Sequence, residues 1–196
     1  MYERKDRLYR KAKAQRLRSR AAFKLEALDR GLLGPGHRVV DLGCWPGGWL
    51  QVASRRVGPT GRVVGVDTRP MAPLGLSNVR VVQGDVCGEE AVEEALRELG
   101  GQADVVLSDM SPSLSGVRDR DEARASELVR RALDVAVRLL RPGGSFVCKI
   151  FMNSDYPELR DTVGRRFDRV AATRSEATRK GSAELYLVAR GFRPQA

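Results

Sequence analysis

The residues best suited to chemistry begin with a glycine-rich stretch, Asp41-Leu-Gly-Cys-Trp-Pro-Gly-Gly48, which directly follows the apolar pair Val39 and Val40. An apolar strand, a glycine-rich turn and a helix start together indicate a nucleotide-type site. Glycine lets the backbone approach a ligand closely, and the first turn of a helix has unpaired N–H groups. The stretch lacks the G-x-G-x-x-G spacing that grips a pyrophosphate. Its leading acid and its proline favour S-adenosylmethionine as the ligand, although such turns also occur for packing reasons.

Three further aspartates follow apolar runs that read as strands: Asp67, Asp85 and Asp109. Ligands of open α/β sheets bind beyond the carboxyl ends of the strands, so we expect these carboxylates at one edge. Asp67 could accept from two ribose hydroxyls, Asp85 could face an adenine amino group, and Asp109 could lie beside a cationic centre. Any single one could instead be a loop carboxylate or a helix cap. Together with the glycine-rich stretch they predict a nucleoside crevice, in which a carboxylate attracts a positive sulfonium.

The elements that must position these residues alternate along the chain. We predict strands over 38–41, 62–67, 79–83, 103–108, 145–150, 167–172 and 184–189. We predict helices over 21–33, 49–57, 89–99, 122–140 and 156–166. The middle strands are near-continuous runs of valine, leucine and isoleucine, which is typical of parallel strands covered on both faces. The pattern predicts a Rossmann-like α/β fold with a seven-stranded, mostly parallel sheet, helices on both faces and an antiparallel last strand.

Composition bounds the partners. The 196 residues carry a net charge of +10, and we expect a single domain over 21–196 after a basic arm over 1–20. Lysines and arginines crowd this arm, with Tyr2 and Tyr9 interleaved. It is either a solvated, partly disordered tail or an RNA-binding arm whose cations contact phosphates and whose tyrosines stack on bases. The overall charge favours the RNA-binding arm.

Cysteine and histidine usage argues against a metal site. Cys44, Cys87 and Cys148 make neither a disulfide framework nor a zinc spacing, so each is expected to be a buried thiol in a reducing cytoplasm. His37 is the only histidine, and we expect it on the loop before the first strand. No apolar run reaches the roughly 18 residues of a membrane span, and the N-terminus is too charged for a signal peptide. We expect a cytoplasmic monomer that binds neither metal nor membrane.

From about residue 18 to residue 192 the chain resembles the FtsJ-like RNA 2′-O-ribose methyltransferases. The resemblance is carried by Arg18-Ser-Arg-Ala-Ala-Phe-Lys-Leu25, Asp41-Leu-Gly43 with Pro46-Gly-Gly-Trp49, Ser108-Asp-Met-Ser-Pro112, Pro142-Gly-Gly-Ser-Phe-Val-Cys-Lys-Ile150 and Glu184-Leu-Tyr-Leu-Val188. The nearest members are bacterial and methylate a uridine of 23S ribosomal RNA. The resemblance therefore implies the S-adenosylmethionine-dependent methyltransferase fold, S-adenosylmethionine as cofactor, and methyl transfer to a ribose 2′-hydroxyl in the large ribosomal subunit.

The resemblance also implies site residues. The family's Lys-Asp-Lys-Glu tetrad falls on Lys24, Asp109, Lys149 and Glu184. The cofactor contacts that it carries over are Gly43, Gly47, Trp49, Asp67, Asp85 and Asp109. Two departures are visible, because Cys44 and Trp45 replace small residues, and Ser111 and Ser113 stand where alanine and asparagine are common. We expect the first pair to reshape the methionine end of the cofactor pocket and the serines to alter nucleotide contacts.

Lys149 also has a physical argument of its own. It lies in the apolar run 146–151, where an unpaired ammonium would be costly. It could simply reach water from the end of a strand. Between Asp109 and Glu184 it would instead be a held point charge that aligns the 2′-oxygen with the methyl carbon. We expect Lys149 to accept the hydroxyl proton late in the transfer, with Lys24 and Glu184 orienting it.

Three other functions are consistent with parts of the same sequence. A non-catalytic, cofactor-binding ribosome-assembly factor would carry the same loop, but it would not need the intact tetrad. A nicotinamide dehydrogenase is disfavoured, because the dinucleotide loop and a Ser/Tyr/His acid–base set are both missing. A transfer RNA or a capped RNA is the alternative substrate. Arg118, Arg120 and Arg124 fit a large structured RNA without naming it.

Overall fold

The computed structural model describes residues 3–113, 115–175, 177–178 and 181–194. Its helices are α1 (Glu3–Ala14), α2 (Ala22–Leu28), α3 (Gly48–Val57), α4 (Glu89–Leu99), α5 (Arg118–Leu139) and α6 (Tyr156–Gly164). Its strands are β1 (Arg38–Leu42), β2 (Arg62–Asp67), β3 (Val79–Gln83), β4 (Ala103–Ser108), β5 (Leu140–Phe151), β6 (Phe167–Thr173) and β7 (Glu184–Phe192).

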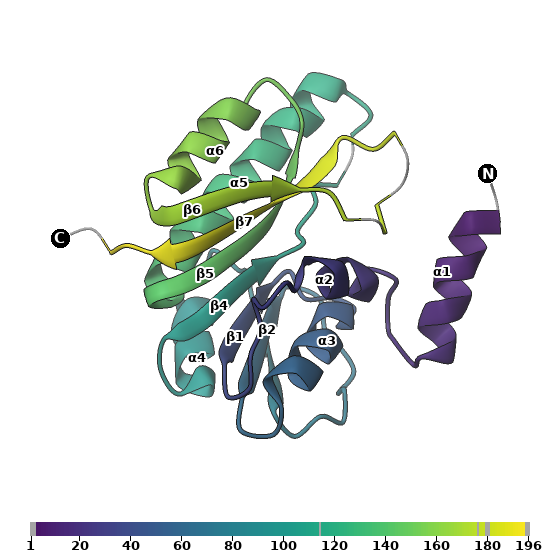
Figure 1. Cartoon of the computed structure of the whole chain (residues 1–196), viewed down its shortest axis with the longest axis vertical. Helices are drawn as coiled ribbons and strands as arrows, with labels where there is room; N and C mark the ends of the chain where they lie inside the picture. The colour runs from purple at the N-terminus through teal and green to yellow at the C-terminus, as the bar shows by residue number, and fades with distance from the viewer. Residues whose placement is uncertain (1–2, 114, 176, 179–180, 195–196) are drawn as a thin grey trace.

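All of these strands form one sheet in the order β3-β2-β1-β4-β5-β7-β6 (Figure 1). β1 to β5 pair in parallel, whereas β7 runs antiparallel to both of its neighbours, β5 and β6. The predicted α/β sheet with an antiparallel last strand is confirmed. The chain runs outward from β1 to β3 and then crosses back to β4. The switch point therefore lies between β1 and β4, where the carboxyl ends of the strands open a crevice.

Helices cover both faces of the sheet (Figure 1). α4, α5 and α6 pack against one face, on a core that includes Val40, Val64 and Phe146. α2 and α3 pack against the other face, on a core that includes Val39 and Val63. Neighbouring strand residues point to opposite faces, so valine runs such as Val39-Val40 supply both cores. This explains why the parallel strands show no polar alternation.

The N-terminal segment contains a helix that the sequence did not predict. α1 lies outside the sheet, beyond α2 (Figure 1). Ala12 is buried, and the Lys11 Nζ lies 4.8 Å from the centroid of the Phe23 ring on α2. The following segment is tied to α3, because the Arg16 carbonyl accepts from Gln51 Nε2 and the Arg18 N–H donates to Gln51 Oε1.

Three other predictions need correction. α5 starts at Arg118 instead of residue 122, with Asp119 and Asp121 in a first turn that favours negative charge. α2 ends at Leu28 instead of residue 33, because the chain turns there and the Asp29 Oδ1 accepts from the Leu33 N–H. Cys44 and Cys148 are buried as predicted, but Cys87 is partly exposed. No helix in the part of the chain described here is long and apolar enough to cross a bilayer.

Candidate active site

Four side chains from distant parts of the chain meet beyond the ends of β4 and β5. Lys24 lies on α2, Asp109 directly follows β4, Lys149 lies near the end of β5, and Glu184 begins β7. Because β7 is antiparallel, its first residue lies at the same edge as the last residues of β5. Lys24 Nζ is 2.7 Å from Glu184 Oε1, and Lys149 Nζ is 3.2 Å from Asp109 Oδ1. The structure brings the four predicted tetrad residues together as two ion pairs.

Lys149 is the most buried member of this cluster. Its side chain is 6% exposed, and its ammonium donates both to the main-chain carbonyl of Asp109 at 2.6 Å and to Asp109 Oδ1. Burial lowers the pKa of Lys149, because a desolvated ammonium is disfavoured. The carboxylate of Asp109 opposes this shift, and the charge of Lys24 adds to it. Lys149 therefore releases a proton more readily than a free lysine does.

Glu184 has the opposite balance. Burial raises the pKa of Glu184, but the hydrogen bond and the charge of Lys24 outweigh burial and leave the pKa below its ordinary value. The Thr178 hydroxyl adds a hydrogen bond to Glu184 Oε1 at 2.9 Å. Glu184 is therefore a carboxylate at neutral pH, and it can hold Lys24 in place.

Tyr186 is a member of the cluster that the sequence analysis missed. It is fully buried, and its hydroxyl donates to Asp109 Oδ1 at 2.7 Å and lies 3.3 Å from Glu184 Oε1. Burial and the two carboxylates raise the pKa of Tyr186 far above its ordinary value, so it stays a hydrogen-bond donor. The sequence could have indicated Tyr186, because residues 184 and 186 are two positions apart on one strand and therefore point to the same face of the sheet. Tyr186 joins the two ion pairs into one network.

A hollow of about 360 Å³ opens beside this cluster. Two carboxylates, Asp67 and Asp109, line it. The other lining residues are Gly43, Trp45, Thr68, Arg69, Val86, Met110, Ser111 and Leu128. It lies beyond the carboxyl ends of β1, β2 and β4, at the switch point. Gly43 has a φ of 74°, and a Cβ at this position would collide with Met110. Glycine is therefore required where the backbone borders the hollow.

Asp41, near the end of β1, is a buried carboxyl group without a hydrogen-bond partner among the described residues. It is 1% exposed. Burial raises its pKa well above the ordinary value, and the charges of Asp109 and Asp67 raise it further. Within the described part of the chain, no group of three acidic, cysteine or histidine side chains is arranged to hold a metal ion. The two carboxylates that line the hollow, Asp67 and Asp109, fit a cationic organic ligand such as S-adenosylmethionine.

The other predicted cofactor contacts lie around the hollow without lining it. Asp85 accepts from the Cys87 N–H at 3.0 Å and borders a neighbouring hollow, although the next residue, Val86, lines the main one. Gly47 precedes α3 and faces Met71. Trp49 is buried; its indole N–H donates to the Ala21 carbonyl and its ring packs on Tyr186. A role for these three in cofactor binding stays a prediction.

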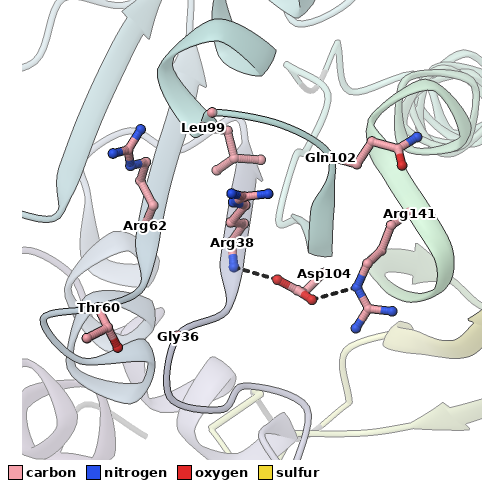
Figure 2. Close-up of a pocket in the computed structure, with 9 residues that line it drawn as sticks. Gly36, Arg38, Thr60, Arg62, Leu99, Gln102, Asp104 and Arg141 are labelled. Carbon is pink, nitrogen blue, oxygen red and sulfur yellow. Dashed lines mark hydrogen bonds and ion pairs between the residues drawn. The ribbon is translucent and has the colours of Figure 1, made fainter.

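A larger hollow, of about 520 Å³, lies at the opposite end of the sheet and contains none of the predicted residues (Figure 2). There Asp104 accepts from the Arg38 N–H and from Arg141 Nε, each at 2.7 Å. Burial raises the pKa of Asp104, but these hydrogen bonds outweigh burial and hold it below its ordinary value. Arg62 donates to the Glu98 carbonyl at the end of α4. These groups hold strand and helix ends in place, so the smaller hollow is the candidate site.

Solved structures define the class of protein. A structure from Plasmodium falciparum, described as a ribosomal RNA methyltransferase, superimposes with a TM-score of 0.79 at 28% identity, covering 91% of this chain and all of that one. Fibrillarin from Aeropyrum pernix, solved with natively bound S-adenosylmethionine, shares the fold with a TM-score of 0.58 at 20% identity, covering 88% and 74% of the two chains. The sheet order is that of the S-adenosylmethionine-dependent methyltransferases.

Sequence relatives define the family. Residues 17–192 match the FtsJ-like methyltransferase family. A ribosomal RNA large subunit methyltransferase E from Methanothrix thermoacetophila is 47% identical over 95% of this chain and 72% of its own length. One from an Anaeromyxobacter species is 44% identical over all of this chain and 71% of its own length. The chain belongs to the FtsJ-like methyltransferase family.

Proposed function

We propose that this protein transfers a methyl group from S-adenosylmethionine to a ribose 2′-hydroxyl of large-subunit ribosomal RNA, with a uridine of 23S RNA as the target. The observation that carries the proposal is the buried network of Lys24, Asp109, Lys149, Glu184 and Tyr186 beside the hollow. The substrate comes from the names of the relatives, which are 44–47% identical to this chain. The net charge of +10 fits an RNA partner.

The cofactor, when bound, supplies an electrophilic methyl group on a positively charged sulfur. The chain's own residues then have two tasks, which are to align the nucleophile and to take up its proton. Asp109 belongs to both the hollow and the network, so it joins the cofactor end to the lysine end of the site. Its carboxylate attracts a cationic ligand on one side and fixes the Lys149 ammonium on the other.

Lys149 is proposed to position the 2′-oxygen and to receive its proton. A charged lysine donates to a hydroxyl oxygen and orients its lone pair. Only a neutral lysine can accept the proton, and the lowered pKa of Lys149 increases the population of that form. The neutral amine takes the proton as bond formation makes the oxygen more acidic, and it becomes an ammonium. Lys24 keeps that pKa low through its positive charge, and Glu184 holds Lys24 in place. Tyr186 holds Asp109 in the orientation that Lys149 requires.

The finer expectations belong to the same proposal. We propose that residues 1–20 act as an RNA-binding arm, that the protein works as a monomer, and that it acts in the cytoplasm, where large subunits are assembled. We propose that the two ends of S-adenosylmethionine are held by the cofactor contacts that the resemblance implies, which are Gly43, Gly47, Trp49, Asp67, Asp85 and Asp109.

Methyl transfer from labelled S-adenosylmethionine to undermethylated large subunits tests the proposal. The assay compares the wild type with Lys149→Ala and with Arg160→Ala, a matched control that removes an exposed cation from α6. We expect label on a ribose 2′-oxygen, a loss of about 10²- to 10⁴-fold in turnover for Lys149→Ala, and normal turnover for the control. Both variants should bind cofactor.

The alternatives give different results. Label on free transfer RNA, but not on the large subunit, would assign a different substrate. Tight cofactor binding without transfer to any RNA would indicate a non-catalytic assembly factor. Normal turnover of Lys149→Ala would remove Lys149 from the proposed chemistry.

A further inference from the structure

Trp45 is a large apolar side chain that the fold leaves uncovered. It is 48% exposed, on the loop between β1 and α3, and it lines the cofactor hollow together with Asp67 and Arg69. Tryptophan is mostly covered in folded chains. The other tryptophan, Trp49, follows that rule and is 3% exposed. An exposed indole at the edge of a ligand hollow therefore needs an explanation.

The position of Trp45 is fixed by the end of β2. Its N–H donates to Asp67 Oδ2 at 2.8 Å, and the Arg69 N–H donates to Asp67 Oδ1 at 2.9 Å. One carboxylate thus holds the backbone of both residues. The Arg69 guanidinium then lies over the Trp45 ring, 4.9 Å from its centroid, which is the geometry of a cation–π contact. The indole is held in place beside the hollow without being buried.

We propose that Trp45, supported by Arg69, forms a wall over the adenosine part of the cofactor, and not at the methionine end that the sequence suggests, because its N–H is bound to Asp67, and that it sets the binding affinity of the cofactor. Trp45 is anchored through Asp67, whose carboxylate is the residue proposed to accept from the ribose hydroxyls. Val86, Met110 and Leu128 give the hollow other apolar surface, so a bound nucleoside would cover the exposed part of the indole. The proposal rests on the proposed function only in taking S-adenosylmethionine as the ligand, and it does not depend on the RNA substrate.

The position of the wall makes it a positioning element and not a catalytic one. The adenosine part is shared by S-adenosylmethionine and by S-adenosylhomocysteine, the product that remains after methyl transfer. Trp45 therefore strengthens the binding of both molecules equally. Asp109 differs in this respect, because its charge favours the positive sulfonium of the methyl donor over the neutral sulfur of the product.

Binding of both molecules to Trp45→Ala, Trp45→Phe and the wild type tests the proposal, without any RNA. Val81→Ala, which shortens another exposed apolar side chain away from the hollow, is the matched control. We expect Trp45→Ala to bind both molecules about tenfold more weakly, Trp45→Phe to recover most of the affinity, and Val81→Ala to bind normally. Turnover of the Val81→Ala control at saturating cofactor should stay within about twofold of the wild type.

Tryptophan fluorescence gives an independent readout. The chain has two tryptophans, and of these Trp45 lines the hollow. S-adenosylmethionine should change the emission of Trp49→Phe, which reports Trp45 alone, and this change should be larger than that in Trp45→Phe, which reports Trp49 alone. This measurement holds even if Trp45→Ala folds poorly.

Two results would overturn the proposal. One is unchanged affinity of Trp45→Ala for both molecules. If this variant also binds RNA more weakly, Trp45 belongs to the RNA-binding surface instead. Emission of Trp49→Phe that does not respond to S-adenosylmethionine, at a concentration at which calorimetry shows that this variant is saturated with it, is the other. If the wild type binds cofactor but methylates no RNA, the proposed function fails while the binding test of Trp45 stands.

Discussion

At the scale of single residues, the ionisation of Lys149 links the site to pH. Burial lowers its pKa, Asp109 opposes that shift, and the Lys24 ammonium lowers the pKa further. The proton-accepting form is the neutral one, so the rate should rise with pH and level off below the pKa of roughly 10.4 of a free lysine. Lys24→Met removes a positive charge. The pKa of Lys149 then rises, and the rising limb of the pH–rate profile should move to higher pH.

The measurement is single-turnover methyl transfer over a pH series, with the wild type and Lys24→Met at saturating cofactor. Glu184 loses its partner in the same variant, so the maximum rate should also fall. A rising limb at the same pH in both proteins would show that Lys24 does not tune Lys149.

Tyr186→Phe tests the hydroxyl that joins the two ion pairs. The change removes a 2.7 Å hydrogen bond to Asp109 from a buried site, while the aromatic ring keeps its packing on Trp49. We expect turnover to fall about tenfold, because one buried hydrogen bond contributes about 1–2 kcal/mol to positioning. Steady-state kinetics measures this loss, and Tyr156→Phe on α6 is the matched control. Equal turnover of Tyr186→Phe and the wild type would make Tyr186 a packing residue only.

Asp41→Asn should stabilise the ligand-free protein and weaken its cofactor binding. The pKa of Asp41 is raised in the folded state by burial, and by Asp109 and Asp67. Its destabilising effect is therefore absent below the unfolded pKa of about 3.9 and grows as pH rises above that value. We expect a gain of about 1–3 kcal/mol in the free energy of unfolding at pH 7 and a smaller gain near pH 4.5.

Chemical denaturation at the two pH values measures that difference for Asp41→Asn. Asp104→Asn is a control of opposite sign, because hydrogen bonds hold the pKa of Asp104 below its ordinary value. It should destabilise the protein, and more so at neutral pH. Equal stability of Asp41→Asn and the wild type at pH 7 would contradict the idea that Asp41 carries an unbalanced charge.

At the scale of elements, strand order explains how the site is assembled. β4 and β5 deliver Asp109 and Lys149 at their carboxyl ends, and β7 delivers Glu184 at its amino end. In the register between β5 and β7, Lys149 is opposite Tyr186 and Phe151 is opposite Glu184. A parallel β7 would place Glu184 at the other end of the sheet. The reversed direction of this one strand is therefore what completes the network.

The same strands show how far the sequence can be interpreted. Buried apolar runs and the turns between them are local signals, so the strands and their α/β alternation could be predicted. The antiparallel pairing of β7 with β6 follows from the connection without a helix between them and is confirmed. The pairing of β7 with β5 could not be predicted, because it depends on contacts between residues far apart in the chain. Helix α1 was missed for a related reason. Its segment is mostly charged and shows no apolar periodicity. Its packing becomes visible only in the structure, where Ala12 of α1 is buried and Lys11 lies over the ring of Phe23 on α2.

Deleting residues 1–15 tests the basic arm as an element. The deletion removes a cluster of cations that includes Arg10, Lys11 and Lys13. RNA affinity should fall by about tenfold or more at low salt, and its dependence on salt should become weaker, because each lost phosphate contact lowers the salt slope by nearly one. Cofactor affinity should stay within about twofold, since α1 does not line the hollow.

Filter binding of RNA over a salt series, with calorimetry for the cofactor, measures both effects. Lys13→Ala, which removes only one of these cations, should lower the slope by less than one-third of the loss seen for the deletion. An unchanged salt slope in the deletion variant would show that residues 1–15 are not the RNA contact.

At the scale of the whole molecule, the hollow and the proton-handling network are built from different parts of the chain. The hollow is built by segments that follow β1, β2, β3 and β4, with Leu128 from α5. The proton-handling network takes Lys149, Glu184 and Tyr186 from β5 and β7. The whole chain carries a net charge of +10, whereas two carboxylates, Asp67 and Asp109, line the hollow. The molecule as a whole attracts a polyanion, while its centre attracts a small cation.

This division has a consequence for the order in which the protein matures during synthesis. The ribosome synthesises the segments that line the hollow first, and β7 is the last of the described strands to be synthesised. β7 must then enter between β5 and β6, two strands that were made before it. Until that insertion, Glu184 and Tyr186 are not available to the site. The residues that line the hollow are therefore synthesised before Glu184 and Tyr186, and the active site is complete only when β7 has been inserted between β5 and β6.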